Sequence, residues 1–156
     1  VVLGVVHHAN GRDYLLFRCG LYGYSVLDRQ ARTVFRYLPA SSFNPMAAGF
    51  QETFIWCKPF YDPKSNLMAV EGCLWAAPSS VIVLDFSKPM QAQETWVDVN
   101  DWIEDKDDGE YLILDFVRWY DDGLVVRASF EEDTNDMTIP FERIFTALKK
   151  GGMPVS

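Results

Sequence analysis

The feature that most constrains the fold of this chain is an internal repeat of turns and strands. Residue pairs typical of hairpin turns occur at nearly regular intervals, at Asn10-Gly11, Asp62-Pro63 and Asp122-Gly123. The first two turns are each followed by an apolar strand, a stretch of small residues and a strand that ends in Leu-Asp. The aspartates of these endings, Asp28 and Asp85, keep a similar interval. A period of about 50 residues is typical of propeller blades and similar arrays.

The segments between the turns have the composition of β-strands, being short and rich in β-branched and aromatic residues. Parallel strands would need crossover helices that this sequence does not offer, so we expect antiparallel hairpins. The expected strands cover residues 14–19, 24–27, 33–38, 53–57, 67–75, 81–84, 94–98, 111–119 and 124–130. Asp28 and Asp85 are expected to cap the backbone amides of the turns that follow them.

One helix is expected over residues 140–150. Pro140 stands at its first turn, Glu142 lies near its start, and two lysines precede the stop at Gly151. Its apolar residues share one face that should dock on a sheet: Phe141, Ile144, Phe145 and Leu148. Weaker helical turns are expected near residues 44–48 and 99–104.

Two phrases of the repeat resemble a known family. Residues 60–72, Phe-Tyr-Asp-Pro-Lys-Ser-Asn-Leu-Met-Ala-Val-Glu-Gly, followed by Val-Ile-Val-Leu-Asp-Phe at 81–86, look like one blade of a WD40-like β-propeller. Residues 119–126, Trp-Tyr-Asp-Asp-Gly-Leu-Val-Val, look like the first turn of the next blade. The resemblance covers about two repeats well and a third in part. It departs from the family where Leu27 and Leu84 stand in place of tryptophan and where the Gly-His pair is absent.

Chain length limits what this resemblance implies. Propellers have typically 4–8 blades, whereas 156 residues supply at most three. We therefore expect a single mainly-β domain over residues 1–156, either complete or part of a longer repeat protein. Its antiparallel hairpins form a twisted sheet or sandwich, which we favour, or a partial propeller-like array, with one C-terminal helix at about 140–150.

Charge and composition exclude several classes of function. The chain has 22 acidic and 14 basic residues and a net charge of -8, which argues against a nucleic-acid binder. No apolar run approaches the ~20 residues of a membrane span, and no secretory signal is evident, so we expect a soluble cytoplasmic protein. Cys19, Cys57 and Cys73 form no CxxC pair, and their odd number indicates neither a disulfide framework nor a zinc site.

The acidity is local. Residues 94–110 carry eight acidic side chains and one lysine, and residues 131–136 carry four acidic side chains, whereas residues 1–40 carry five arginines and two aspartates. These segments are either solvated loops or regions that attract each other within one fold or across two copies.

The acidic segment 94–110 contains two tryptophans, which distinguishes it from an ordinary solvated loop. An exposed aromatic among charges is typical of a protein-binding hot spot or a sugar-stacking platform. The leading hypothesis is therefore a non-enzymatic interaction or scaffold module that binds a protein partner or itself. The predicted binding surface consists of Trp96, Asp98, Asp101, Trp102 and Glu104. No catalytic residue, cofactor or metal site is predicted.

The alternative hypothesis is a small-ligand or carbohydrate-active domain. Glu71 lies inside the apolar run 67–75, where a half-buried carboxylate, together with a second one, would line a pocket walled by tryptophans. Two conceivable metal sites are not favoured. His7 and His8 would point to opposite faces of a strand, and Lys106 occupies a position where a calcium loop in the segment 94–110 needs an oxygen ligand.

Overall fold

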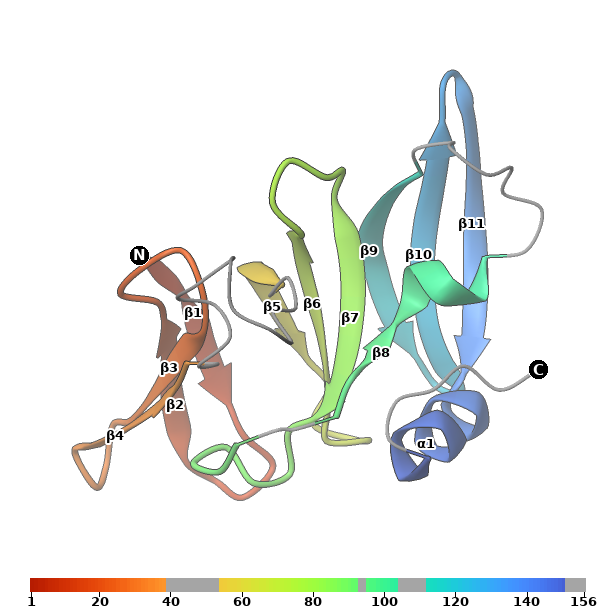
Figure 1. The fold of residues 1–156 in the computed structure, drawn as a ribbon. Helices are drawn as coiled ribbons and strands as arrows, with labels where there is room; N and C mark the ends of the chain where they lie inside the picture. Colours follow the sequence, from red (N-terminus) through yellow and green to blue (C-terminus); the bar gives the residue numbers. More distant parts are fainter. Residues whose placement is uncertain (39–53, 93–94, 104–111, 151–156) are drawn as a thin grey trace.

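The fold consists of three antiparallel sheets and one C-terminal helix. A computed structural model describes residues 1–38, 54–92, 95–103 and 112–150 (Figure 1). Sheet A contains β1 (Val2–His7), β2 (Asp13–Phe17), β3 (Tyr24–Asp28) and β4 (Thr33–Tyr37). Sheet B contains β5 (Ile55–Tyr61), β6 (Leu67–Cys73), β7 (Ser80–Asp85) and β8 (Val97–Asp98), after which a short 3-10 helix, η2 (Val99–Trp102), follows. Sheet C contains β9 (Ile113–Tyr120), β10 (Gly123–Phe130) and β11 (Asp133–Pro140), and α1 (Phe141–Lys149) follows it.

The three sheets lie side by side in chain order, with sheet B between the other two (Figure 1). β1 lies next to β5, and β9 lies next to β6 and β7. The three turns of the sequence repeat connect the first two strands of each sheet, as the repeat predicts. The mainly-β class and the C-terminal helix are therefore confirmed, and the described strands form neither a single sheet nor a closed barrel.

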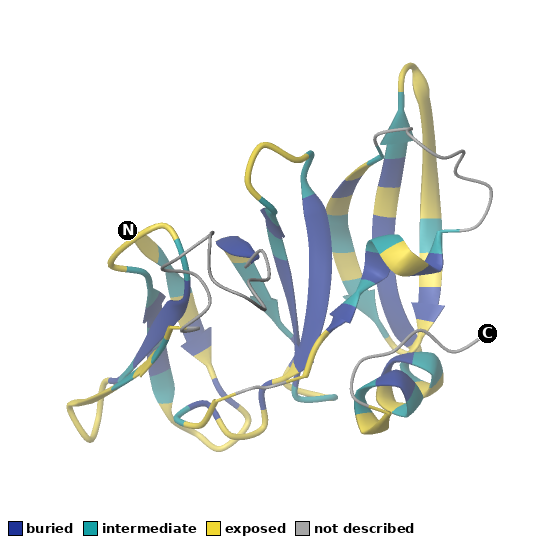
Figure 2. Ribbon diagram, viewed as in Figure 1, coloured by how far each residue is buried: buried dark blue, intermediate teal, exposed yellow. Residues whose placement is uncertain are grey.

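Two apolar cores lie on the two faces of sheet B. Alternate residues of β6 divide between them: Met68 and Val70 pack toward sheet A, whereas Leu67 and Ala69 pack toward sheet C. Every residue of β7 from Ser80 to Leu84 is buried (Figure 2). A strand buried on both faces has an almost unbroken apolar sequence, which explains the run Val-Ile-Val-Leu at 81–84.

Several element boundaries differ from those expected. β6 ends at Cys73, so Trp75 lies in the loop before β7, and β5 continues through Pro59 to Tyr61. β1 and β11 are strands that the sequence pattern does not predict, and the acidic segment at 131–136 forms the turn and the start of β11. The expected turn at 44–48 lies outside the described residues, whereas η2 and α1 lie where helical structure is expected.

The two Leu-Asp endings have the capping role that the repeat predicts. The Asp28 carboxylate accepts hydrogen bonds from the amides of Gln30 and Ala31, both at 3.1 Å, and from Arg12 Nη1 at 2.6 Å. The Asp85 carboxylate accepts a hydrogen bond from the Ser87 amide at 2.9 Å. Both aspartates therefore hold the turn that follows their strand.

Gly72 is required where β5 approaches β6. A Cβ atom there would meet the carbonyl oxygen of Ile55 and the ring of Phe54. We predict that Gly72→Ala lowers the free energy of unfolding by about 3 kcal/mol, because the backbone of β5 would have to move. Chemical denaturation measures this. Gly20→Ala is the matched control, since no atom lies within 4 Å of its Cβ position; equal losses for the two variants would contradict the packing argument.

Acid should weaken the turn that Asp28 holds. The amide of Ala31 and the guanidinium of Arg12 keep the pKa of Asp28 below its ordinary value of 3.8. The stabilisation is therefore present above that value and is lost as the pH falls through the lower pKa of the folded state. Asp28→Asn should be less stable than the parent at neutral pH and should lose less stability on acidification. Thermal unfolding across pH measures this, with Glu132→Gln as the control; an unchanged acid dependence in Asp28→Asn would contradict it.

Candidate functional site

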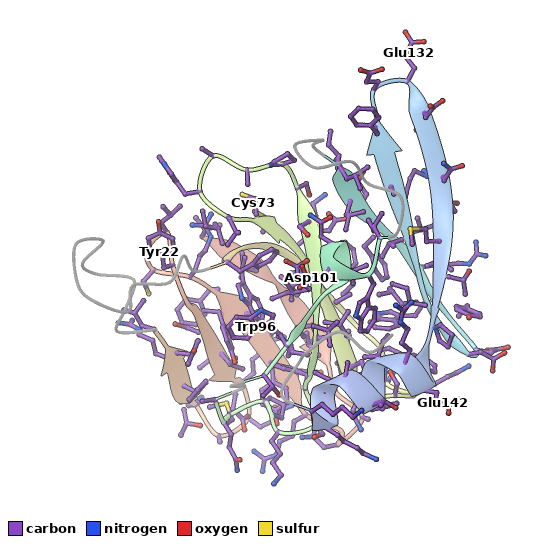
Figure 3. The ribbon with its side chains drawn as sticks, turned by 45° about the vertical axis from the view of Figure 1, so that its right-hand side comes forward. Tyr22, Cys73, Trp96, Asp101, Glu132 and Glu142 are labelled. Carbon is purple, nitrogen blue, oxygen red and sulfur yellow. The ribbon has the colours of Figure 1, made fainter. Side chains whose placement is uncertain are left out.

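The predicted acidic surface lies on β8 and η2, which divide its residues between the core and solvent. Val97, Val99 and Trp102 point inward and are buried, whereas Trp96 and Asp101 are exposed (Figure 3). The Asp98 carboxylate accepts hydrogen bonds from the Asn100 amide at 3.0 Å and from Ser80 Oγ at 3.2 Å. Asp98 therefore starts η2 and joins it to β7 while remaining half-exposed.

Trp102 does not belong to this surface. Its side chain is 3% exposed and packs in the core between sheets B and C, and the guanidinium of Arg143 on α1 lies 4.7 Å from its ring centroid. The prediction of Trp102 as a contact residue is wrong, because η2 turns the indole toward the apolar side of β7 rather than toward solvent. Glu104, the fifth predicted residue, lies outside the described residues.

A second exposed tryptophan lies outside this segment. Trp75 is 64% exposed in the loop between β6 and β7, compared with 38% for Trp96. That loop and the start of η2 surround a hollow of about 100 Å³, whose lining includes Leu74, Ala77 and Asp98. The predicted surface lacks Trp75 because the strand expected over 67–75 includes it. The sequence does indicate that Trp75 lies in a loop. Trp75 is followed by Ala76-Ala77-Pro78, and small residues and proline mark a loop.

We call the group Trp75, Trp96, Asp98 and Asp101 the tryptophan–aspartate surface. The two indoles supply large apolar contact area, and the carboxylates supply negative charge. Phe54, Ser80 and Asn100 line the hollow together with Asp98, so the surface is supported by β7 and η2 rather than by the loop alone. This arrangement can bind a ligand that is both apolar and basic.

Glu71 has a structural contact that the sequence does not reveal. Its Oε1 atom accepts a hydrogen bond of 2.6 Å from the Phe116 amide, which joins β6 of sheet B to β9 of sheet C. The half-buried side chain also lines a hollow of about 190 Å³ together with Lys58, Cys57 and Cys73. Glu71 is the one carboxylate among the described residues that line this hollow, whereas a glycosidase needs a pair.

The two neighbouring histidines make separate contacts. His7 Nδ1 lies 2.6 Å from an Asp13 carboxylate oxygen at the surface. His8 is buried, its Nε2 lies 2.8 Å from the Phe86 carbonyl oxygen, and its Nδ1 accepts a hydrogen bond from the Asn10 amide at 3.0 Å. Within the described ranges, no three His, Cys, Asp or Glu side chains are arranged to hold a metal ion.

Comparisons with known proteins do not place the chain in a family. No protein-family model, no curated protein and no solved structure matches it. In the part of the chain that the structure describes, no helix has the length and apolar character needed to cross a lipid bilayer.

The contact between Glu71 and sheet C can be tested by changing its acceptor. We predict that Glu71→Ala lowers the free energy of unfolding by about 1–3 kcal/mol, because the Phe116 amide loses its partner. Glu71→Gln keeps a side-chain carbonyl oxygen and should lose less than half as much. Urea denaturation of the two variants measures the difference, and equal stability of Glu71→Ala and the parent protein would show that this contact is dispensable.

Proposed function

We propose that this chain is a non-enzymatic interaction module that binds a basic, partly apolar segment of another protein through the tryptophan–aspartate surface. The observation that carries the proposal is the exposure of two indoles. Trp75 is exposed in the loop before β7, and Trp96 is exposed in the segment that also carries the half-exposed Asp98 and the exposed Asp101. Most tryptophan area is buried in folded domains, so two exposed indoles next to charged groups have the composition of a binding hot spot.

The charge of the sequence segment that carries Trp96 favours a basic partner. Trp96, Asp98 and Asp101 belong to the segment 94–110, which has eight acidic side chains and one lysine. A local excess of negative charge accelerates the approach of a basic segment, and the indoles then supply the apolar contact that slows its release. Binding of this kind weakens as the salt concentration rises, because salt screens exposed charges.

The small volume of the hollow beside Glu71 weighs against the small-ligand alternative. Small-molecule sites enclose roughly 300–1,000 Å³, whereas the hollow beside Glu71 has about 190 Å³. One oxygen of Glu71 is engaged by the Phe116 amide, so this carboxylate is held by a structural contact rather than presented to a ligand. The protein-binding function gives a role to the exposed side chains of Trp75 and Trp96, whereas the small-ligand function gives them none.

We also propose that the three sheets are blades of a propeller-like array that serves as the scaffold of the surface. Sheets A and B each have four strands in chain order, and the strands of sheet C also follow one another in space. Their side-by-side arrangement supports the WD40-like resemblance of residues 60–72 and 119–126. In such an array the loops between strands form the natural contact surface, and Trp75 lies in one of them.

A peptide selection tests the proposed binding function. A library of random peptides would be selected against the full chain, and we expect the enriched peptides to combine lysine or arginine with aromatic or aliphatic residues. Trp75→Ala and Trp96→Ala should each weaken binding of an enriched peptide about tenfold or more, because a hot-spot indole is lost. Asp101→Lys should also weaken binding of this peptide, and it should reduce the salt dependence of the binding. Isothermal titration calorimetry measures these changes.

Glu132→Lys is the matched control for Asp101→Lys. Both residues are exposed and acidic, but Glu132 lies at the tip of the β10–β11 hairpin, far from Trp96 and Asp101 in Figure 3. Glu132→Lys should leave peptide affinity within about twofold of the parent, since exposed charges beyond a Debye length are screened. Enriched peptides without basic residues, or equal losses from both lysine variants, would refute the proposal.

A further inference from the structure

A small hollow of about 170 Å³ lies at one end of sheet A, between the loop that joins β2 to β3 and the end of β4. Its lining is mainly apolar and contains three tyrosines and two leucines: Tyr22, Tyr24, Tyr37, Leu21 and Leu38. Arg36 is the one charged residue of the described lining. The hollow is smaller than the sites that enclose small molecules, so the occupant that it fits is a single side chain.

Two arginines at this hollow are available to an acidic partner. Arg36 Nη2 donates to Cys19 Sγ at 3.2 Å, and Arg18 Nη1 donates to the Gly20 carbonyl oxygen at 2.9 Å; Cys19 and Gly20 both line the hollow. Neither guanidinium group forms an ion pair with a described residue. Each has five N–H donors, so both can still bind carboxylates.

The tip of the β10–β11 hairpin has the complementary composition. Glu131 and Glu132 form its two-residue turn, and Asp133 pairs with Phe130 across it. The three acidic side chains are exposed and form no ion pair with a residue that the structure describes. Phe130 is half-buried and, within the described ranges, belongs to neither apolar core. The tip therefore offers one aromatic ring surrounded by carboxylates.

The tip cannot fill the hollow of its own chain. Tyr22 at the hollow and Glu132 at the tip lie at opposite sides of the molecule in Figure 3. The hairpin also projects beyond the other strands of the fold (Figure 1). The hollow is open to solvent, because Leu21 and Leu38 in its lining are exposed. A contact between tip and hollow therefore needs two molecules.

We propose that the hollow of sheet A holds the hairpin tip of a second copy of this chain, with Phe130 between the tyrosines and the carboxylates facing Arg18 and Arg36. Hollow and tip lie at the same edge of the stack but at its opposite ends. Arg18 hydrogen-bonds to Val1, and both the start of the chain and the tip lie at the upper edge in Figure 1. A two-fold axis through the middle of that edge brings each tip onto the hollow of the other copy. The contact then forms twice, and the dimer is closed.

Local charge favours this contact, although two copies with a net charge of -8 repel each other as a whole. Residues 131–136 carry four acidic and no basic side chains, whereas residues 14–27 and 33–38, which include the described lining of the hollow, have two arginines as their only charged residues. At physiological ionic strength, exposed charges more than about 8 Å apart are largely screened. The attraction between groups in contact therefore outweighs the general repulsion at and above this ionic strength.

Sedimentation equilibrium of the full chain, from micromolar to submillimolar concentration at physiological ionic strength, tests the dimer. We expect a monomer–dimer equilibrium that weakens as more salt is added. Glu132→Lys and Arg36→Glu should each weaken the dimer about tenfold or more, because each places like charges together at both contacts. An equimolar mixture of the two variants should restore the dimer. One contact of the mixed dimer keeps its original charges, and the other has them exchanged.

Asp101→Lys is the matched control for Glu132→Lys, and Arg29→Glu is the matched control for Arg36→Glu. Each control makes the same change of charge at an exposed residue outside the contact, since Asp101 lies on η2 and Arg29 in the turn after β3. Both should leave the dimer constant within about twofold of the parent. Phe130→Ala should weaken the dimer without changing its salt dependence, because the ring carries no charge.

The dimer and the proposed peptide binding respond to different variants. Glu132→Lys should disrupt the dimer and spare peptide binding, whereas Asp101→Lys should have the reverse effect, so the failure of one proposal is distinguishable from the failure of the other. Recovery of the dimer in the mixture also shows that both contact variants are folded. A chain that stays monomeric, or a mixture that does not recover, would overturn the dimer proposal. Equal losses from Asp101→Lys and Glu132→Lys, or a hollow that binds an acidic segment of a different protein in place of a second copy, would also overturn it.

Discussion

The whole arrangement depends on a central sheet that is apolar on both faces. Sheet B lies between two other sheets, and β6 divides its side chains between two cores, with Val70 on one side and Ala69 on the other. A charged side chain at either position would be buried, since both faces are covered. Because both faces of sheet B are buried, few polar or charged side chains can lie between the sheets. The groups that can meet a partner therefore lie on the loops between strands and on the outer faces of sheets A and C.

Polar contacts join each sheet to its neighbour, including a backbone hydrogen bond from the Leu114 amide to the Ser79 carbonyl oxygen. His8 reaches the Phe86 carbonyl group between sheets A and B, while Glu71 accepts from the Phe116 amide and Trp119 donates to the Phe60 carbonyl oxygen between sheets B and C. Apolar packing is not directional, whereas these hydrogen bonds select one position. The residues that suggest metal binding or catalysis in the sequence, His8 and Glu71, are thus part of this set of structural contacts.

The sequence predicts the elements whose pattern is local. It does not predict elements that form only because a partner strand pairs with them. The turns, the Leu-Asp endings and α1 can be read directly, because turn chemistry and helix periodicity act over a few residues. β11, with the sequence Asp-Thr-Asn-Asp-Met-Thr-Ile-Pro, has little strand propensity and forms because β10 pairs with it along its whole length. The same limit applies to the site. Neighbouring acidic residues do not reveal which tryptophan faces the core, so the sequence does not distinguish Trp96 from Trp102. For Trp75 the small residues and proline that follow it do indicate a loop.

The charged residues of the chain are distributed unevenly along its sequence. A net charge of -8 opposes indiscriminate association of the chain as a whole. The acidic side chains are concentrated in the segments 94–110 and 131–136, whereas residues 1–40 carry five arginines and two aspartates. A chain with the same composition but evenly spread charge would lack the local excess of negative charge in the segment 94–110, which is the feature that would attract a basic partner.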